Sequence, residues 1–201
     1  DLWSIAPATG ARTRITNLGT AFKDAQISSL ETDQTNRLIF SQLEGATLFS
    51  DVNLTYAYAA VDIGYLDYAG SAITTSPKRI RTGASRIVAL TVDADNHVWA
   101  VDHQNRLRCF KRVPSGYQED TAATLDLPTA LNLGTPFWVC DIAINFHNGA
   151  RYLLIKPDDG GDNEGRVYRL ECDGSLRSSV NGQPNPLVVG IYEFGGCLTI
   201  D

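Results

Sequence analysis

The chain has 201 residues, of which 43% are hydrophobic and 20% are charged, a composition typical of a globular protein. Its formal net charge of −6 disfavours nucleic acid as a partner, because binding to a phosphate backbone needs a basic surface. No segment approaches the roughly 20 apolar residues that a membrane helix requires, so we expect no membrane insertion. The length suits a single domain over residues 1–201, and the start at Asp1 without any Met suggests a processed or excised part of a larger protein.

The N-terminal part of the chain contains short strand patterns separated by turn sequences. Asp1–Ile5 (DLWSI) precedes the turn sequence PATG and an alternating strand pattern, ARTRIT. A second group consists of Ser28–Glu31 (SSLE), the turn TDQTN, Arg37–Phe40 (RLIF) and Ala46–Phe49 (ATLF). Ala59–Asp62 (AAVD), followed by IGYLDYAG, is a looser candidate for another group. These patterns predict short antiparallel strands with tight links.

The clearest unit runs from Leu90 to Arg112. Ala89–Asp93 (ALTVD) is an apolar run that ends in an acid, and the turn tripeptide ADN follows it. Val98–Val101 (VWAV) is β-branched and aromatic, as a buried strand should be, and Arg106–Phe110 (RLRCF) alternates with period two. Three strands with two tight turns form a meander that cannot bury its own faces, so we expect copies of it alongside.

Two further copies can be found. Ile142–Asn145 (IAIN), Arg151–Ile155 (RYLLI) and Gly165–Leu170 (GRVYRL) repeat the plan, with FHNGA as the first turn. Leu198–Asp201 (LTID) resembles Leu90–Asp93 (LTVD) and would supply the first strand of a unit whose other strands lie at the N-terminus. Such pairing closes a ring of repeats and removes an exposed sheet edge.

Two of these segments resemble known propeller repeats. VDADNHVWAVDHQNRLRCF resembles the NHL-type repeat, in which an apolar residue and Asp precede a turn, a hydrophobic strand, a second Asp and an Arg-containing strand. DIAINFHNGARYLLI and GRVYRLECDGSL are similar to blades of gluconolactonase-like and soluble sugar dehydrogenase propellers. The resemblance implies an all-β propeller of four or five blades, closed by pairing of the C-terminal strand with the N-terminal blade. A fold of this kind does not by itself specify an activity.

The repeat places an acid or an amide at the end of each leading strand. These residues are Glu31, Asp62, Asp93, Asn145 and Asp201. If the leading strands line a central channel, their oxygens meet at one end of it, which suits Ca²⁺ with its roughly six to eight oxygen ligands. The alternative is structural, because an acid in this position commonly accepts hydrogen bonds from backbone N–H groups of the following turn.

A second acidic segment, DDGGDNEG, occupies residues 158–165. Asp158, Asp159 and Asp162 are candidate Ca²⁺ ligands, although the segment lacks the alternating ligand order of an EF-hand loop. A solvated hairpin insertion explains the same composition.

Tyrosines gather in TYAYAAVDIGYLDYAG, where they alternate with two aspartates. Tyr56, Tyr58, Tyr65 and Tyr68 are candidate ligand-binding residues, because exposed rings beside carboxylates suit a carbohydrate pocket. Tyrosines that alternate along strands also fill a core or cover an edge, and this packing alternative stays open.

The cysteines do not form a metal set, because no two are spaced like zinc ligands. Cys140 and Cys197 fall in leading strands of neighbouring units, where a disulfide is conceivable, but buried free thiols are the favoured interpretation. The sequence Asn53-Leu54-Thr55 is a glycosylation sequon if the chain is secreted from a eukaryote.

No catalytic triad motif and no phosphate-binding glycine loop occurs in the sequence. We therefore predict a non-catalytic recognition or scaffold propeller that binds a glycan or a protein partner in a secreted, cell-surface or virion assembly. The alternative is a metal-dependent enzyme of the gluconolactonase or sugar dehydrogenase type. A third hypothesis, a structural subunit, predicts a homo-oligomer or a larger assembly.

Overall fold

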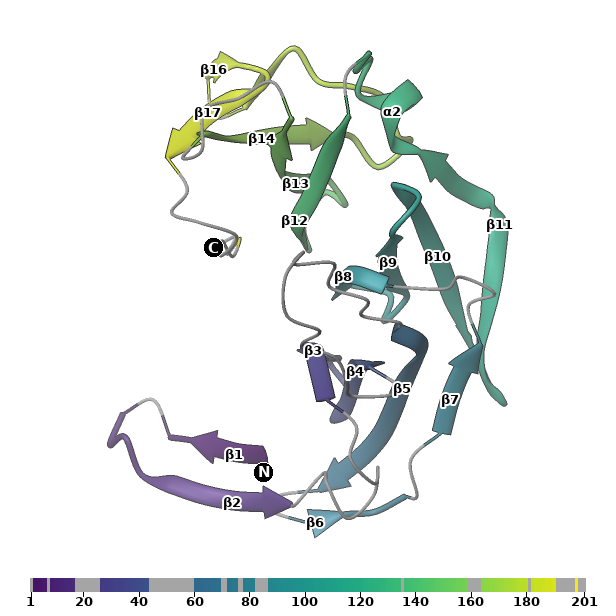
Figure 1. The fold of residues 1–201 in the computed structure, drawn as a ribbon. Coiled ribbons are helices and arrows are strands. Elements are labelled where there is room, and N and C mark those ends of the chain that lie inside the picture. The colour runs from purple at the N-terminus through teal and green to yellow at the C-terminus, as the bar shows by residue number, and fades with distance from the viewer. Residues whose placement is uncertain are drawn as a thin grey trace, which may run out of the picture. The chain divides into compact units, whose positions relative to one another are not determined.

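The computed structural model describes residues 2–6, 8–16, 26–43, 60–69, 72–75, 78–81, 87–134, 136–158, 164–180, 182–190 and 198. These residues form antiparallel β-sheets almost throughout, with a four-residue helix, α2 (Leu127–Ala130), so the all-β prediction is confirmed (Figure 1). The chain divides into two compact units, Asp1–Arg86 and Ile87–Asp201. Within the described ranges no helix has the length and apolar character needed to cross a membrane.

The unit Ile87–Asp201 begins with a four-stranded antiparallel sheet. Its strands are β8 (Ile87–Val92), β9 (Val98–Asp102), β10 (Arg106–Val113) and β11 (Gly116–Asp126), in the spatial order β11-β10-β9-β8. The first three are the strands predicted from the repeat, and all of β9 is buried, as its apolar sequence indicates. The fourth strand was not predicted; a tight hairpin pairs it with β10, with Val113 opposite Gly116.

A second four-stranded sheet follows in the same unit. Its order is β12 (Phe137–Ile144), β13 (Arg151–Pro157), β14 (Glu164–Leu170) and β17 (Leu187–Gly190). A small hairpin of β15 (Ser179–Val180) and β16 (Gln183–Pro184) lies between the last two strands in the sequence. The three predicted strands are confirmed, and two consecutive four-stranded meanders are the building plan of propeller blades.

One hydrophobic core joins these two sheets. The leading strands β8 and β12 contact each other, and apolar side chains of both sheets pack into a single cluster. Its buried members include Trp99, Leu107 and Cys109 from the first sheet and Ile142, Leu153 and Tyr168 from the second. The neighbour that a single meander needs to bury its apolar face is therefore present.

The unit Asp1–Arg86 contains a third sheet. Its order is β3 (Gln26–Thr32), β4 (Arg37–Leu43), β5 (Ala60–Ala69) and β6 (Ala72–Ile73), and β7 (Lys78–Arg81) also pairs with β5. The strands predicted at 28–31 and 37–40 are confirmed. The third strand is β5, whereas the predicted Ala46–Phe49 lies outside the described residues. The looser group at 59–62 is not a leading strand, because residues 60–62 begin β5.

A close backbone approach explains one glycine of this sheet. Gly64 of β5 pairs with Phe40 of β4, and a Cβ added at Gly64 would lie 2.2 Å from the ring atom Cε2 of Phe40. Phe40 is fully buried, so its ring has little room to move away. Glycine is therefore the residue that lets this ring pack against the neighbouring strand.

Residues near both ends of the chain contribute to the β-structure. At the N-terminus β1 (Leu2–Ile5) and β2 (Arg12–Thr16) form the predicted hairpin. Near the C-terminus the N–H of Leu198 donates to Oδ2 of Asp141 in β12 at 2.7 Å, and its side chain packs beside Leu154. The rest of the predicted closing strand, residues 199–201, lies outside the described residues.

Candidate functional site

Asp93 directly follows β8 and organises the turn that leads to β9. Its Oδ1 accepts hydrogen bonds from the backbone N–H groups of Asp95 at 3.0 Å and His97 at 2.8 Å. Its Oδ2 accepts the indole Nε1–H of Trp99 at 2.8 Å. Asn96 has φ of 61°, a left-handed conformation that Asn tolerates better than most residues. Asp93 thereby holds the turn and the tryptophan ring together.

The same turn occurs at Asp33 and Asp102. Each of these carboxylates accepts hydrogen bonds from the backbone N–H groups two and four residues later. The third residue after each acid is Asn36 or Asn105, with φ of 60° and 58°. These turns have the geometry of the structural alternative considered from the sequence, in which the acid satisfies backbone donors.

Asn145 takes the place of Asp93 in the second sheet. Its Oδ1 accepts hydrogen bonds from the backbone N–H groups of His147 at 2.9 Å and Asn148 at 3.2 Å. Its own N–H donates to the carbonyl of Ala150 and closes the turn at 2.9 Å. The amide oxygen of Asn145 is thus engaged by its own turn, as the carboxylate of Asp93 is.

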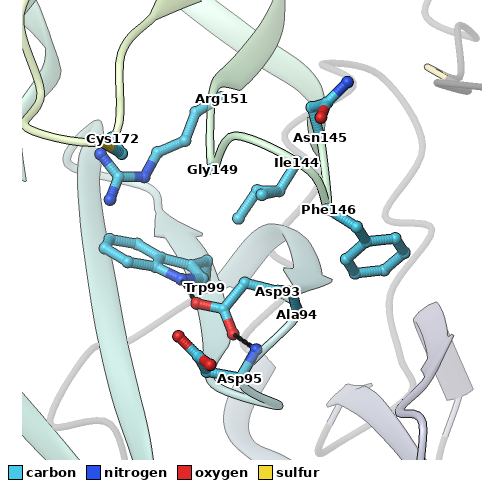
Figure 2. Close-up of a pocket in the computed structure, with 10 residues that line it drawn as sticks. All are labelled: Asp93, Ala94, Asp95, Trp99, Ile144, Asn145, Phe146, Gly149, Arg151 and Cys172. Atoms are coloured by element: carbon cyan, nitrogen blue, oxygen red, sulfur yellow. Dashed lines mark hydrogen bonds between the residues drawn. The ribbon is translucent and has the colours of Figure 1, made fainter.

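A pocket of about 280 Å³ lies where these two turns meet, within the unit Ile87–Asp201 (Figure 2). It is lined by the Asp93 turn, the end of β12 with its following turn, the start of β13 and the turn after β14. The lining residues are Asp93, Ala94, Asp95, Trp99, Ile144, Asn145, Phe146, Gly149, Arg151 and Cys172. Of the five predicted strand-end residues, the structure brings Asp93 and Asn145 to one pocket.

Arg151 is the buried cation of this pocket. The residue is only 7% exposed, and its guanidinium carbon lies 3.9 Å from the centre of the Trp99 ring. Its Nη1 donates to the carbonyl of Glu171 at 3.2 Å, while its buried Nε has no hydrogen-bond partner in the described part of the chain. Desolvation lowers the pKa of Arg151, although a guanidinium remains charged at any physiological pH.

Three exposed groups complete the lining. The ring of Phe146 is 53% exposed and points away from the strands at one side of the pocket in Figure 2. The carboxylate of Asp95 and the thiol of Cys172 are also exposed. Among the lining residues no nucleophile is hydrogen-bonded to a base. The arrangement therefore suits binding of a polar small molecule better than covalent chemistry.

In the described part of the chain, Cys109, Cys140 and Cys172 carry free thiols. Cys109 is 1% exposed, and desolvation raises its pKa to about 12. Cys140 lies in β12, where desolvation also raises the pKa of its thiol, and Cys172 is exposed. Cys140 carries a free thiol, as the favoured interpretation expects, and Cys197 lies outside the described residues.

The predicted Ca²⁺ ligands have varied positions. In the described residues no three His, Cys, Asp or Glu side chains come together as a metal site. Glu31 lies within β3 opposite Ile39, so the residue of this sheet that has the geometry of Asp93 is Asp33. Asp62 lies within the third strand, opposite Arg81, and not at the end of a leading strand. Asp158 is exposed directly after β13. Asp159, Asp162 and Asp201 lie outside the described residues.

The tyrosine cluster is partly described. Tyr65 is 4% exposed, and the guanidinium carbon of Arg37 lies 4.5 Å from the centre of its ring. Tyr68 is half-buried near the end of β5. The packing alternative accounts for Tyr65, whereas Tyr56 and Tyr58 lie outside the described residues.

Sequence reasoning missed Arg151, Phe146 and Cys172. Arg151 was seen only as the first residue of a predicted strand and Phe146 only as part of a turn. The sequence holds a weak signal for Phe146, because an aromatic residue among polar residues in a turn does not serve the packing of a core. The pocket itself depends on the contact between two sheets, which no local pattern encodes.

No family model matches the chain, and no curated protein matches its sequence. Solved structures do match. A luciferin-regenerating enzyme aligns at 14% identity with a TM-score of 0.54, over 90% of this chain and 51% of that chain. The N-terminal domain of Nup159 aligns at 13% identity with a TM-score of 0.49, over 96% and 46% of the two chains. A quinonprotein alcohol dehydrogenase-like protein from Bacteroides thetaiotaomicron aligns at 10% identity with a TM-score of 0.36, over 87% and 49%.

These structural neighbours are β-propeller-type folds. The chain spans about half the length of each of them, 51%, 46% and 49%. At such low identity, the likeness to the first of them shows the fold alone.

Proposed function

We propose that the chain is a non-catalytic recognition module that binds a saccharide in the pocket between the two sheets of the unit Ile87–Asp201. The lining of that pocket carries the proposal. The exposed ring of Phe146, the open carboxylate of Asp95 and the buried guanidinium of Arg151 all belong to residues that line this pocket. An aromatic ring packs on the apolar face of a sugar, while carboxylate and guanidinium groups bind its hydroxyls.

The size of the pocket supports a small ligand. Its volume of about 280 Å³ is just below the roughly 300–1,000 Å³ of typical small-molecule sites. One sugar ring at the end of a glycan suits this volume. A protein partner would need a contact area on the order of 1,200 Å² or more, which a pocket that fits one sugar ring does not provide.

The hydrogen bonds of Asp93 support a binding role over a catalytic one. Both carboxylate oxygens are engaged, Oδ1 by two backbone N–H groups and Oδ2 by the indole of Trp99. A general base needs a carboxylate that can reach the proton of a substrate. The metal-dependent enzyme hypothesis accordingly requires ligands other than those of this turn.

We place this module in a propeller of four or five NHL-like blades, in a secreted, cell-surface or virion assembly. Ring closure through the C-terminal strand is supported by the N-terminal hairpin, which lacks a leading strand of its own in the described residues. Glycan recognition suits such a location, because the ligands are displayed outside cells.

A glycan array with two matched variants tests the proposal. Phe146→Ala removes the exposed ring of the pocket, while Trp138→Ala removes a ring of similar exposure, 52% against 53%, that does not line it. We expect the wild-type protein and Trp138→Ala to bind the same saccharides and Phe146→Ala to lose at least about tenfold in affinity. A blank array for the wild-type protein, or equal losses in both variants, would overturn it.

A further inference from the structure

Arg37 and Arg151 occupy equivalent places in their own sheets. Arg37 is the first residue of β4, Arg151 is the first residue of β13, and each follows a turn closed by an acid or an amide. Each guanidinium lies over an aromatic ring, at 4.5 Å from the centre of Tyr65 and at 3.9 Å from the centre of Trp99. The two sites differ in what binds the hydrogen-bonding edge of the guanidinium.

Arg37 has a carboxylate on that edge. Its Nε donates to Oδ1 of Asp67 at 2.6 Å and its Nη2 to Oδ2 at 3.2 Å, a two-pronged pair. Asp67 lies directly opposite Arg37 in the sheet. The residue opposite Arg151 is Leu170, which is buried and apolar. The position that supplies the carboxylate in one sheet therefore supplies none in the other.

The same edge of Arg151 is left without a carboxylate. Nη1 donates to the carbonyl of Glu171, Nε is buried without a partner, and in the described ranges no carboxylate lies within ion-pair distance of this guanidinium. The Asp93 carboxylate is engaged by Trp99 and by its own turn. Figure 2 shows Arg151 above the Trp99 ring and the Asp95 carboxylate below it. A nine-tenths-buried cation that lacks a counterion destabilises the protein unless an anion joins it.

We infer that the pocket binds a carboxylate of its ligand, held by the guanidinium of Arg151. This inference rests on the proposed saccharide recognition and makes it specific for an acidic sugar with a single carboxylate. The net charge of −6 of the chain is compatible with one buried contact of this kind, because it does not depend on a broad basic surface. Phe146 then packs on the sugar ring that carries the carboxylate.

Matched pairs of sugars test the inference. Methyl β-D-glucuronide differs from methyl β-D-glucoside only by its carboxylate, and the galacto-configured pair differs in the same way. Calorimetric titration should give at least about tenfold tighter binding of the acidic member of one pair, since hydrogen bonds to charged groups are worth about this much. Arg151→Gln should remove that preference, and Arg151→Lys should restore only part of it, because Lys keeps the charge and lacks the two-pronged edge.

Arg106→Gln is the matched control. Arg106 is exposed at the start of β10 and does not line the pocket, so this variant makes the same change of charge elsewhere and should keep the preference for the acidic sugar.

A second experiment uses the wild-type protein alone and so avoids any folding defect of the Arg151 variants. Cys172 is exposed and lines the pocket, so the rate of its alkylation by iodoacetamide reports whether the pocket is occupied. The glucuronide should slow this alkylation, and the glucoside should slow it less.

The outcomes separate the inference from the proposed function. Equal binding of acidic and neutral sugars, unchanged by Arg151→Gln, would overturn the carboxylate inference and leave saccharide recognition standing. Protection of Cys172 by propionate but by none of the sugars would uphold the carboxylate site and overturn saccharide recognition. Absence of any binding and of any protection would overturn both.

Discussion

Asp93 accepts the indole N–H of Trp99 at 2.8 Å, so the acid that follows β8 also fixes the ring on which the guanidinium of Arg151 lies. One carboxylate thus connects the repeated turn of the fold with the lining of the pocket. A change at Asp93 should therefore affect stability first and binding through the position of Trp99.

The turn acid should contribute strongly to stability. Asp93→Ala removes the acceptor for two backbone N–H groups and for the indole of Trp99, whose residue is 6% exposed. We expect the free energy of unfolding to fall by about 3 kcal/mol, because each lost hydrogen bond costs about 1 kcal/mol and a buried donor is left unpaired. Urea denaturation followed by tryptophan fluorescence measures it. Asp95→Ala, an exposed change in the same turn, should have little effect; equal losses in the two variants would contradict the account.

A buried ion pair in the first sheet of the unit Ile87–Asp201 should also contribute strongly to stability. The fully buried Asp102 accepts a hydrogen bond from Nε of Arg108 at 2.8 Å, and Nη1 of the same guanidinium donates to Glu119 at 2.7 Å. Arg108→Ala leaves the Asp102 charge without a cation, so we expect a loss of about 3–5 kcal/mol in the free energy of unfolding.

The control for this pair is Lys111→Ala. Lys111 pairs with Asp120 at 2.6 Å, but its side chain is 54% exposed, so solvent screens the interaction and removal of the lysine should change stability little. If denaturation midpoints fell equally in the two variants, the difference between buried and exposed pairs would not hold here.

The thiols should differ in reactivity. Burial raises the pKa of Cys109 to about 12, so at pH 8.5 almost none of this thiol is ionised, whereas Cys172 is exposed. Iodoacetamide should therefore label Cys172 of the native protein rapidly and Cys109 only after unfolding, with peptide mapping by mass spectrometry as the measurement. Native labelling of Cys109 as fast as that of Cys172 would refute its burial.

The same raised pKa makes stability depend on alkaline pH. The folded state disfavours the Cys109 thiolate, so its contribution is present in full below the ordinary thiol pKa of about 8.5 and is lost as the pH rises towards 12. Urea denaturation of the wild-type protein and of Cys109→Ala gives the free energy of unfolding at several pH values in this range. This free energy should fall less steeply with pH in the variant than in the wild-type protein. Parallel curves would assign the alkaline loss to other groups.

Any stabilisation of the protein by Ca²⁺ should come from a site away from the Asp93 turn. The oxygens of Asp93 and Asn145 already accept hydrogen bonds, which leaves them poor ligands for a further cation. We expect that any rise in melting temperature with Ca²⁺, reversed by a chelator, persists in Asn145→Ala and disappears in Asp158→Asn. Loss of the rise in Asn145→Ala instead would restore the ring of strand-end oxygens as the metal site.

Much of the fold could be predicted from local patterns. Strands β8, β9 and β10 were found because Asp and Asn mark the turns at Asp93 and Asp102, apolar runs mark the first two strands and period-two alternation marks the third. β5 was misassigned because the choice between residues 46–49 and 60–69 as partner of β4 depends on pairing at a distance. Both segments look like strands, and no local feature tells which one pairs.

The candidate site was predicted only in part. Asp93 and Asn145 were identified from the repeat, and both line the pocket. Arg151 was missed because its role depends on stacking on Trp99 across two sheets and on the apolar Leu170 at the position where the other sheet has Asp67. That last difference can be read from the sequence once the register is known, and the register comes from the structure.

The indole N–H signals in a ¹H–¹⁵N spectrum test saccharide recognition at the pocket most directly. The chain has three tryptophans, of which Trp99 lines the pocket, while Trp3 and Trp138 are about half exposed and do not line it. Titration with methyl β-D-glucuronide should shift the Trp99 signal saturably and leave the other two in place. A Trp99 signal that stays fixed for every sugar bound by the protein would contradict the account.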